Sequence, residues 1–269
     1  MRVALISDIH GNLAALEAVL EVHARHPPDE VIVLGDIING AADSKACWDL
    51  VKAKGYTLLR GNHERYLFDF DTPRAEPNWS TPYFAPVHWT LKQFSSQELQ
   101  EMALLPSAMF LKNAPEVFVC HASAKGDKDS VSLYHSEVEI QPLFPQEAKL
   151  IIRGHNHVAF QRELGSSKLF SLGSVGLPLS GKVQAEFAIA EKRSGIWQLT
   201  PQAIPYDVHR TVKNIQESGL LAEGGVMARL FLREIATGSY QVVPFLNFFR
   251  AHCEGMGLEE GLERFLNAY

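Results

Sequence analysis

Three features that would narrow the function class are scarce or absent in this sequence of 269 residues. Its three cysteines, Cys47, Cys120 and Cys253, are an odd number without metal-finger spacing, which argues against a disulfide framework or a zinc finger. No run approaches the about 20 apolar residues that a membrane helix needs. The first apolar run is short and is broken by Asp8 and His10, unlike a signal peptide. We therefore expect a reduced, cytoplasmic protein without a membrane partner.

An excess of positive charge is also missing. The sequence has 25 Lys and Arg against 31 Asp and Glu, a formal net charge of −6, whereas nucleic-acid-binding surfaces are usually basic. We expect no nucleic-acid partner. Its hydrophobic fraction of 46% is that of an ordinary globular protein, and its length allows one large domain with an appendage.

What the sequence does contain is a set of short runs rich in Val, Ile and Leu. The runs do not alternate strictly with polar residues, which is typical of strands buried on both faces. They cover residues 2–6, 30–34, 56–59, 116–120 and 149–152.

Helical patterns separate the first three runs, which predicts an α/β architecture. Asn12 and Asp43 each precede apolar residues at helical spacing and are candidate N-caps. Ser95 followed by Glu98 is a capping-box signature ahead of a short helix that ends near Leu105.

Every predicted strand is followed by residues of a type that binds metals. Singly, each of these residues is more often a turn or cap residue. Jointly they indicate a ligand site, because in α/β sheets ligands bind beyond the carboxyl ends of the strands. In chain order the residues are Asp8, His10, Asp36, Asn62, His63, Glu64, His121, His155 and His157.

The ordered pattern D-x-H, G-D, G-N-H-[DE], a lone His and G-H-x-H resembles the calcineurin-like metallophosphoesterase family. The resemblance extends over about residues 1–190, and the opening is especially similar to the small bacterial phosphoesterases. It implies a two-sheet β-sandwich flanked by helices, in four layers α/β/β/α. We expect residues 1–204 to form this domain.

The resemblance further implies two divalent metal ions. The first would be held by Asp8, His10, Asp36 and His157. The second would be held by Asp36, Asn62, His121 and His155. Asp36 would bridge the two ions. Imidazole, carboxylate and amide ligands together suit Mn, Fe, Zn, Ni or Co better than Ca or Mg, and we favour Mn.

The reaction implied is hydrolysis of a phosphoester by direct attack of a metal-bridging hydroxide, with no phosphoenzyme. His63 would act as general acid for the leaving oxygen. Glu64 would orient a ligand or His63. Arg60 and Asn39 are candidates for substrate contacts, Arg60 because a guanidinium matches phosphate geometry.

Three functions remain open. The first is a phosphodiesterase or phosphatase for a small-molecule substrate. The second is a protein or dinucleoside-polyphosphate phosphatase, because "LRGNHE" looks like the Ser/Thr phosphoprotein phosphatase signature. Against it, Gly40 and Asn39 stand where that family has an arginine and an acid. The third is a non-catalytic interaction scaffold on the same fold, which the retention of every ligand and of His63 opposes.

Residues 205–269 follow the motifs and show helical spacing of apolar and aromatic residues. We expect a helical extension that packs on the sandwich and is not an independent domain. A dimer contact or a cap over the active site are the alternatives, and a homo-oligomer through these helices is possible. His23 and His26 are interpreted as solvated residues at a helix end.

Overall fold

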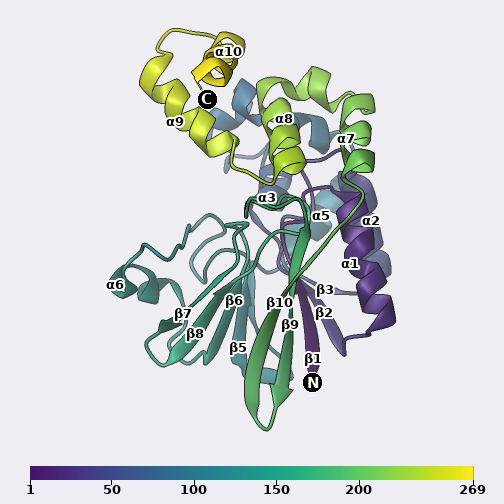
Figure 1. Ribbon diagram of the computed structural model, residues 1–269, viewed down its shortest axis with the longest axis vertical. Coiled ribbons are helices and arrows are strands. Elements are labelled where there is room, and N and C mark those ends of the chain that lie inside the picture. Colours follow the sequence, from purple (N-terminus) through teal and green to yellow (C-terminus); the bar gives the residue numbers. More distant parts are fainter. Residues whose placement is uncertain (269) are drawn as a thin grey trace.

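Two five-stranded sheets face each other in the computed structural model, which describes residues 1–268 (Figure 1). The first sheet has the order β10-β9-β1-β2-β3, and the second has the order β4-β5-β6-β8-β7. The strands of the first sheet are β1 (Arg2–Ile6), β2 (Glu30–Val33), β3 (Thr57–Leu58), β9 (Ala185–Arg193) and β10 (Ile196–Ile204). The strands of the second are β4 (Ala108–Leu111), β5 (Ala114–Cys120), β6 (Leu150–Arg153), β7 (Phe160–Leu164) and β8 (Ser167–Ser171).

The strands that precede the motifs run parallel within each sheet. β1 pairs with β2 and β2 with β3, while in the second sheet β5 pairs with β6 and β6 with β8. The antiparallel strands β9 and β10 extend the first sheet on the side of β1. The carboxyl ends of β1, β2 and β3 therefore lie at one edge of the first sheet, and those of β5 and β6 lie at one edge of the second.

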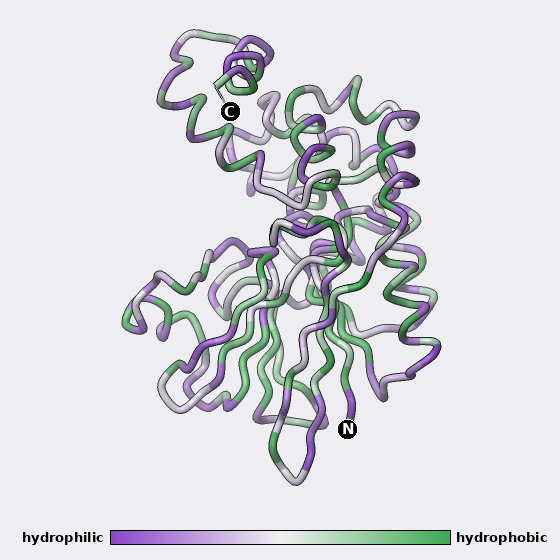
Figure 2. The backbone as a smooth tube through the Cα atoms, viewed as in Figure 1, coloured by the Kyte–Doolittle hydropathy of each residue, from purple (hydrophilic) through white to green (hydrophobic). Residues whose placement is uncertain are grey.

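The main core lies between the sheets. Apolar side chains such as Leu5 and Ile32 in the first sheet share one buried cluster with Val119 and Ile152 in the second. Figure 2 shows the same pattern, with hydrophobic colour along the strands and hydrophilic colour on many of the loops. Burial of a core side chain of this size contributes about 1.5–3 kcal/mol, so the sandwich is a firm support for the loops at its edge.

Helices complete the layers. The outer face of the first sheet packs on a layer of five helices: α1 (Leu13–Arg25), α2 (Ser44–Ala53), α3 (Asn62–Phe68), α4 (Ala85–Leu91) and α5 (Ser96–Leu104). The outer face of the second sheet is covered by the short elements α6 (Glu137–Ile140) and η3 (Gln141–Leu143) and by neighbouring loops. Two further 3-10 turns, η1 (Pro77–Ser80) and η2 (Pro82–Phe84), precede α4. The expected four-layer sandwich is confirmed, with a thin fourth layer.

The local predictions hold with small shifts at the ends of elements. All five predicted strands are present, and Asn12 caps α1 by accepting a hydrogen bond from the Ala15 amide. The capping box of Ser95 and Glu98 is present at α5. Asp43 occupies the N-cap of α2 but makes no side-chain cap bond. The prediction for His23 was wrong: it is buried at 5% exposure, because its position in α1 faces the ring of Phe187.

The helical extension lies beyond the motif end of the sandwich (Figure 1). It consists of α7 (Val208–Glu217), α8 (Leu220–Thr237), α9 (Val242–His252) and α10 (Leu258–Ala268). α7 packs on α1, and α8 packs on α4. The Thr211 hydroxyl donates to Asn12 Oδ1 at 2.8 Å, and Asn214 Nδ2 donates to Asp43 Oδ2 at 2.9 Å. The extension is thus bonded to the N-caps of the two helices that follow the first two motifs.

Candidate metal centre

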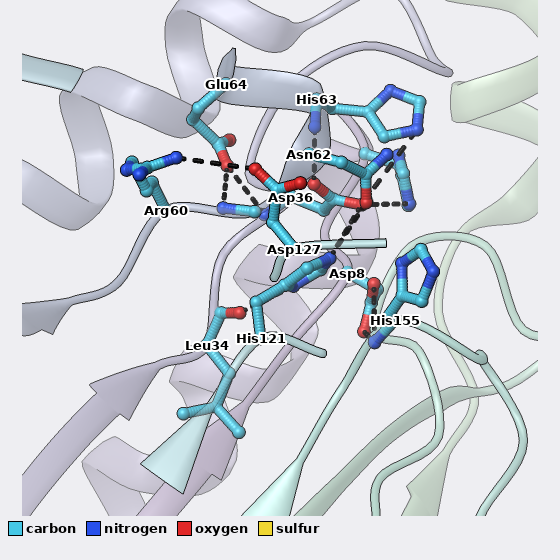
Figure 3. Close-up of polar contacts among 12 residues, drawn as sticks. Asp8, Leu34, Asp36, Arg60, Asn62, His63, Glu64, His121, Asp127 and His155 are labelled. Carbon is cyan, nitrogen blue, oxygen red and sulfur yellow. Dashed lines mark hydrogen bonds and ion pairs between the residues drawn. The ribbon is translucent and has the colours of Figure 1, made fainter. Parts of the chain in front are cut away.

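The polar residues that follow five strands converge at the motif end of the sandwich. Two groups of side chains place one potential ligand atom each within 4.8 Å of one another. The first group is Asp8, His10, Asp36 and His157. The second is Asp36, His121 and His155. Asn62 adjoins the second group, with its Oδ1 at 3.1 Å from His121 Nε2 (Figure 3). Asp36 belongs to both groups, so the structure brings all seven predicted ligands together with Asp36 at the centre.

The potential ligand atoms are close enough to share cations. Asp36 Oδ2 lies 3.4 Å from His121 Nε2 and 3.8 Å from His10 Nε2. His157 Nε2 lies 3.3 Å from Asp8 Oδ1. Metal–nitrogen and metal–oxygen bonds of about 2.0–2.2 Å would place an ion between ligand atoms that are separated by distances of this size.

Three of the imidazoles are oriented by backbone carbonyl groups. Nδ1 of His10 donates to the Asn39 carbonyl at 2.6 Å, Nδ1 of His121 donates to the Leu34 carbonyl at 2.8 Å, and Nδ1 of His157 donates to the Leu177 carbonyl at 2.9 Å. A carbonyl oxygen only accepts, so each Nδ1 carries the proton. The lone pair of each Nε2 is then directed into the centre, which is how metal-binding histidines are usually held.

The backbone at these residues is strained. Only seven non-glycine residues among the described 268 have a positive φ. Five of them are in the motifs, namely Asp8, His10, Asp36, His155 and His157, and a sixth, Asn39, lies three residues after the G-D motif. Such a conformation costs about 1–3 kcal/mol per residue and tends to cluster at functional sites. The clustering is a sign of function that is independent of the residue types.

Two motif glycines allow the loops to approach the carboxylates. A Cβ atom at Gly61 would lie 2.1 Å from Asp36 Oδ1. A Cβ atom at Gly154 would lie 2.0 Å from Ser7 Oγ and 2.8 Å from Asp8 Oδ2. Any side chain at either position would therefore displace a potential metal ligand.

Burial and mutual charge set the protonation states. Burial lowers the pKa of His10 and of His155 to about 3, so both rings are neutral at pH 7. Burial also acts to lower the pKa of His121, but the Asp36 carboxylate outweighs it and raises the pKa to about 9. Burial acts to raise the pKa of Asp36, but His121 and His63 hold it well below its ordinary value. The negative charge of Asp36 that favours a proton on His121 would equally favour a cation, and a bound cation would take the place of that proton.

His63 lies beside both groups. Its Nε2 is 3.9 Å from Asp36 Oδ2, and its ring is edge-on to that of His10. Asn39 Nδ2 contacts His63 Nδ1 at 2.6 Å, and the Thr90 hydroxyl donates to Asn39 Oδ1 at 3.3 Å, which favours an Asn39 amide that donates to His63. In that arrangement the proton of the neutral ring is on Nε2. Burial lowers the pKa of His63, consistent with a neutral ring.

Glu64 organises the backbone beneath Asp36. Its buried carboxylate accepts hydrogen bonds from the amides of Asp36 at 2.9 Å, Ile37 at 2.8 Å and Gly61 at 2.7 Å. Burial and the nearby Asp36 charge raise the pKa of Glu64 to about 7. Glu64 thus positions the loop that carries Asp36, and it makes no hydrogen bond to the His63 ring.

Arg60 is engaged away from the ligand atoms. Its Nε donates to the Leu105 carbonyl at 3.0 Å, and its Nη1 lies 3.4 Å from Asp127 Oδ2 (Figure 3). The same carboxylate accepts from Arg65 Nε at 2.6 Å. The phosphate contact proposed for Arg60 from the sequence stays a prediction, and in this structure its guanidinium is held by other groups.

One buried residue was missed by the sequence analysis. Arg153, at the end of β6, is fully buried and donates to the carbonyl groups of Ala122 and Asp129 at 2.7 Å each. It also bonds Asn156 in the G-H-x-H loop. A charged residue at the end of an apolar run, next to a motif, was the signal available for it.

The donor set fits divalent transition metals. Imidazole nitrogens, two carboxylates and an amide oxygen lie together in one centre, and this combination suits Mn, Fe, Zn, Ni or Co. The buried His and Asp groups could therefore hold metal ions.

The two-sheet α/β sandwich and the cluster of imidazoles and carboxylates at its strand ends agree with a comparison to known protein families. Residues 1–159 match the family of calcineurin-like phosphoesterases, and this chain belongs to that family. The match confirms the resemblance noted in the sequence.

Individual relatives extend over most of the chain. It is 25% identical over 242 residues to the uncharacterized protein MJ0912 of Methanocaldococcus jannaschii, covering 81% of this chain and 93% of that protein. A metallophosphoesterase structure from Sphaerobacter thermophilus has a TM-score of 0.68 at 24% identity and covers 88% of this chain and 100% of that one. The hypothetical protein PH1004 from Pyrococcus horikoshii has a TM-score of 0.71 at 16% identity and covers 89% of this chain and 99% of that one. The two structures support the fold.

A helix that crosses a membrane must be both long and apolar. In residues 1–268, none of the helices combines the length and the apolar character that crossing a membrane would require.

Proposed function

We propose that this chain hydrolyses small phosphodiesters, and related phosphomonoesters less efficiently, in a reaction that depends on two divalent metal ions. The observation that carries the proposal is the position of His63. Its Nε2 is 3.9 Å from the Asp36 oxygen that also faces His121 and His10. A proton donor thus stands at the edge of two ligand groups that share one carboxylate.

Two bound divalent ions would neutralise charge on the phosphoryl oxygens and lower the pKa of a water molecule so that it can attack phosphorus. His63 would take up a second proton and, as the imidazolium, pass the proton on Nε2 to the oxygen that leaves. Asn39 would hold the imidazole through Nδ1, and Glu64 would keep the Asp36 loop in place through its three backbone hydrogen bonds. Water is consumed, and the products are a phosphomonoester and an alcohol.

The preference for a diester rests on the scarcity of positive charge near the ligand groups. Gly40 stands where phosphoprotein phosphatases have an arginine, and Arg60 is paired with Asp127. A monoester dianion carries one more negative charge than a diester and gains more from a guanidinium contact. The metal ions can therefore hold a diester without a guanidinium contact.

The test compares bis(4-nitrophenyl) phosphate with 4-nitrophenyl phosphate, which share a leaving group, on the chain loaded with Mn²⁺. We expect a higher kcat/KM for the diester. A strong preference for the monoester, or efficient turnover of a phosphopeptide, would contradict the proposed substrate class. An absence of turnover with every divalent metal tested would favour the non-catalytic alternative.

A further inference from the structure

A pocket of about 450 Å³ opens beside His63, between the motif loops and the helical extension. We refer to it as the lateral pocket. Its volume lies in the range of about 300–1,000 Å³ that is typical of small-molecule sites. The residues that line it include His63, Tyr66, Phe84, Phe231, Leu246 and Arg250.

The lateral pocket lies on the side of the candidate centre where His63 stands. His63 and Asn39 line the pocket, and these two residues also contact the metal-ligand groups. Under the proposed function His63 faces the leaving oxygen. The part of the substrate that occupies the lateral pocket is therefore the leaving group.

Two walls of different origin enclose the pocket. One wall comes from α3, η2 and α4, where Tyr66 packs edge-on against His63 and Phe84 packs edge-on against Tyr66, with ring centroids 5.2 Å apart in both pairs. The other wall comes from α8 and α9 and includes Phe231 and Leu246. Aromatic and aliphatic walls of this kind favour a flat aromatic ring, such as a nucleobase, whose faces can stack on them.

Arg250 supplies a positive charge at the pocket. It is in the last turn of α9, is exposed, and has no hydrogen-bond or ion-pair partner within residues 1–268. The other arginine considered for phosphate binding, Arg60, is paired with Asp127. A free guanidinium beside an aromatic pocket suits a group that carries a second phosphate.

We infer that the lateral pocket binds the leaving portion of the substrate and that this portion is a nucleotide, with its base between the two walls and its phosphate at Arg250. The inference rests on the proposed function and narrows its substrate class. A bond forms between the water oxygen and phosphorus, and the bond from phosphorus to the nucleotide hydroxyl oxygen breaks. The electron pair goes to that oxygen, which takes a proton from the imidazolium form of His63 and leaves the ring neutral. The nucleotide then leaves as a nucleoside monophosphate with a free hydroxyl.

The experiment measures binding to the full chain loaded with Mn²⁺ by titration calorimetry. The probes are AMP, adenosine and ribose 5-phosphate. AMP should bind at least about fivefold more tightly than either fragment, because stacking of a base and a charge-assisted hydrogen bond each contribute at least that factor. Ribose 5-phosphate accounts for phosphate bound directly by the metal ions.

Two arginine variants of the extension separate a pocket contact from a general charge effect. Arg250→Gln should weaken AMP binding about tenfold and leave adenosine binding nearly unchanged. Arg264→Gln on α10, which removes the same charge at an exposed position outside the pocket, should change neither. Phe231→Ala should weaken AMP and adenosine alike.

Equal affinities for AMP and ribose 5-phosphate, or equal effects of Arg250→Gln and Arg264→Gln, would overturn the inference. Turnover of bis(4-nitrophenyl) phosphate by the unmodified chain is measured in parallel. If turnover is present while AMP behaves like ribose 5-phosphate, only the inference about the pocket fails. If turnover is absent, the proposed function itself fails.

Discussion

The strand-end region and the helical extension both line the lateral pocket, but they are built in different ways. At the strand ends, six non-glycine residues adopt left-handed conformations, and polar side chains are buried in a fixed network. The extension contributes apolar side chains such as Phe231 and Leu246 from α8 and α9, of which α8 is kinked at Gly225, and Arg250 also lines the pocket. Chemistry needs atoms held to within fractions of an ångström, whereas recognition of a leaving group needs a shaped wall. Precise placement of reacting groups requires particular residues in short motifs. A pocket wall requires only apolar residues at helical spacing.

Asp36 is where the strand-end region should be most vulnerable. Asp36→Ala removes the carboxylate shared by both ligand groups and leaves His10 and His121 without their common partner. We expect metal affinity to fall more than about 100-fold, beyond the loss caused by a supporting residue, and turnover to become undetectable. Metal content per chain after dialysis checks this. His157→Ala, which alters only one group, should retain more metal, and equal losses would contradict the sharing of Asp36.

His63 separates proton transfer from metal binding. His63→Ala should lower turnover about 10²–10⁴-fold while metal content stays nearly unchanged. The loss should be larger for an alkyl leaving group than for nitrophenolate, which needs little protonation. Steady-state kinetics on two diesters that differ only in the leaving group measure this difference. Equal losses for both leaving groups would mean that His63 has another role, such as holding the substrate.

Glu64 tests how far the strand-end network depends on a residue that touches no metal. Glu64→Gln keeps the shape but replaces one of the two acceptor oxygens that serve three backbone amides. We expect metal affinity to fall about 10–100-fold. Isothermal titration with Mn²⁺ measures it, and the exposed Glu147→Gln is the matched control. An unchanged affinity would show that the Asp36 loop keeps its position without Glu64.

His23 shows that burial alone does not make a site. It is buried in α1, neither ring nitrogen has a hydrogen-bond partner, and burial lowers its pKa to about 4. The folded state therefore binds this proton less readily than the unfolded state, so stability falls as the pH drops from 6.5 towards 4. His23→Leu should remove about 2 kcal/mol of the stability difference between pH 8 and pH 5.

Urea unfolding at the two pH values measures the effect of His23. The exposed His26→Leu is the control and should preserve the pH dependence of the unmodified chain. An unaltered difference in His23→Leu would mean that this histidine is not held neutral in the folded protein.

The sequence predicted the strand-end region better than the extension. The apolar runs before Asp8, Asp36 and His121 predict buried strands. The positions of the residues that follow are then fixed by the ends of those strands. The seven predicted ligands and His63 lie together, whereas Arg60 is paired with Asp127. Five strands were not predicted: β4, β7, β8, β9 and β10. In β7 and β10, residues such as Arg162 and Pro201 interrupt any simple pattern.

Other features depend on contacts between distant segments and leave no local signal. The pairing of Arg60 with Asp127 joins positions 67 residues apart. The lateral pocket forms only when α9 packs near η2 and α3, and neither helical spacing nor composition specifies that arrangement. His23 was misjudged because it lies near the end of a helix, between the charged residues Glu21 and Arg25, while the ring that covers it, Phe187, comes from β9.

The central claim is that the strand-end groups hold two metal ions that act together on a phosphoester. The most direct measurement is a stepwise addition of Mn²⁺ to metal-stripped protein, with bound metal and hydrolysis of bis(4-nitrophenyl) phosphate measured in the same samples. We predict saturation at two ions per chain and hydrolysis that rises mainly with the second ion. Saturation without hydrolysis, or hydrolysis that persists in the stripped protein, would contradict the account.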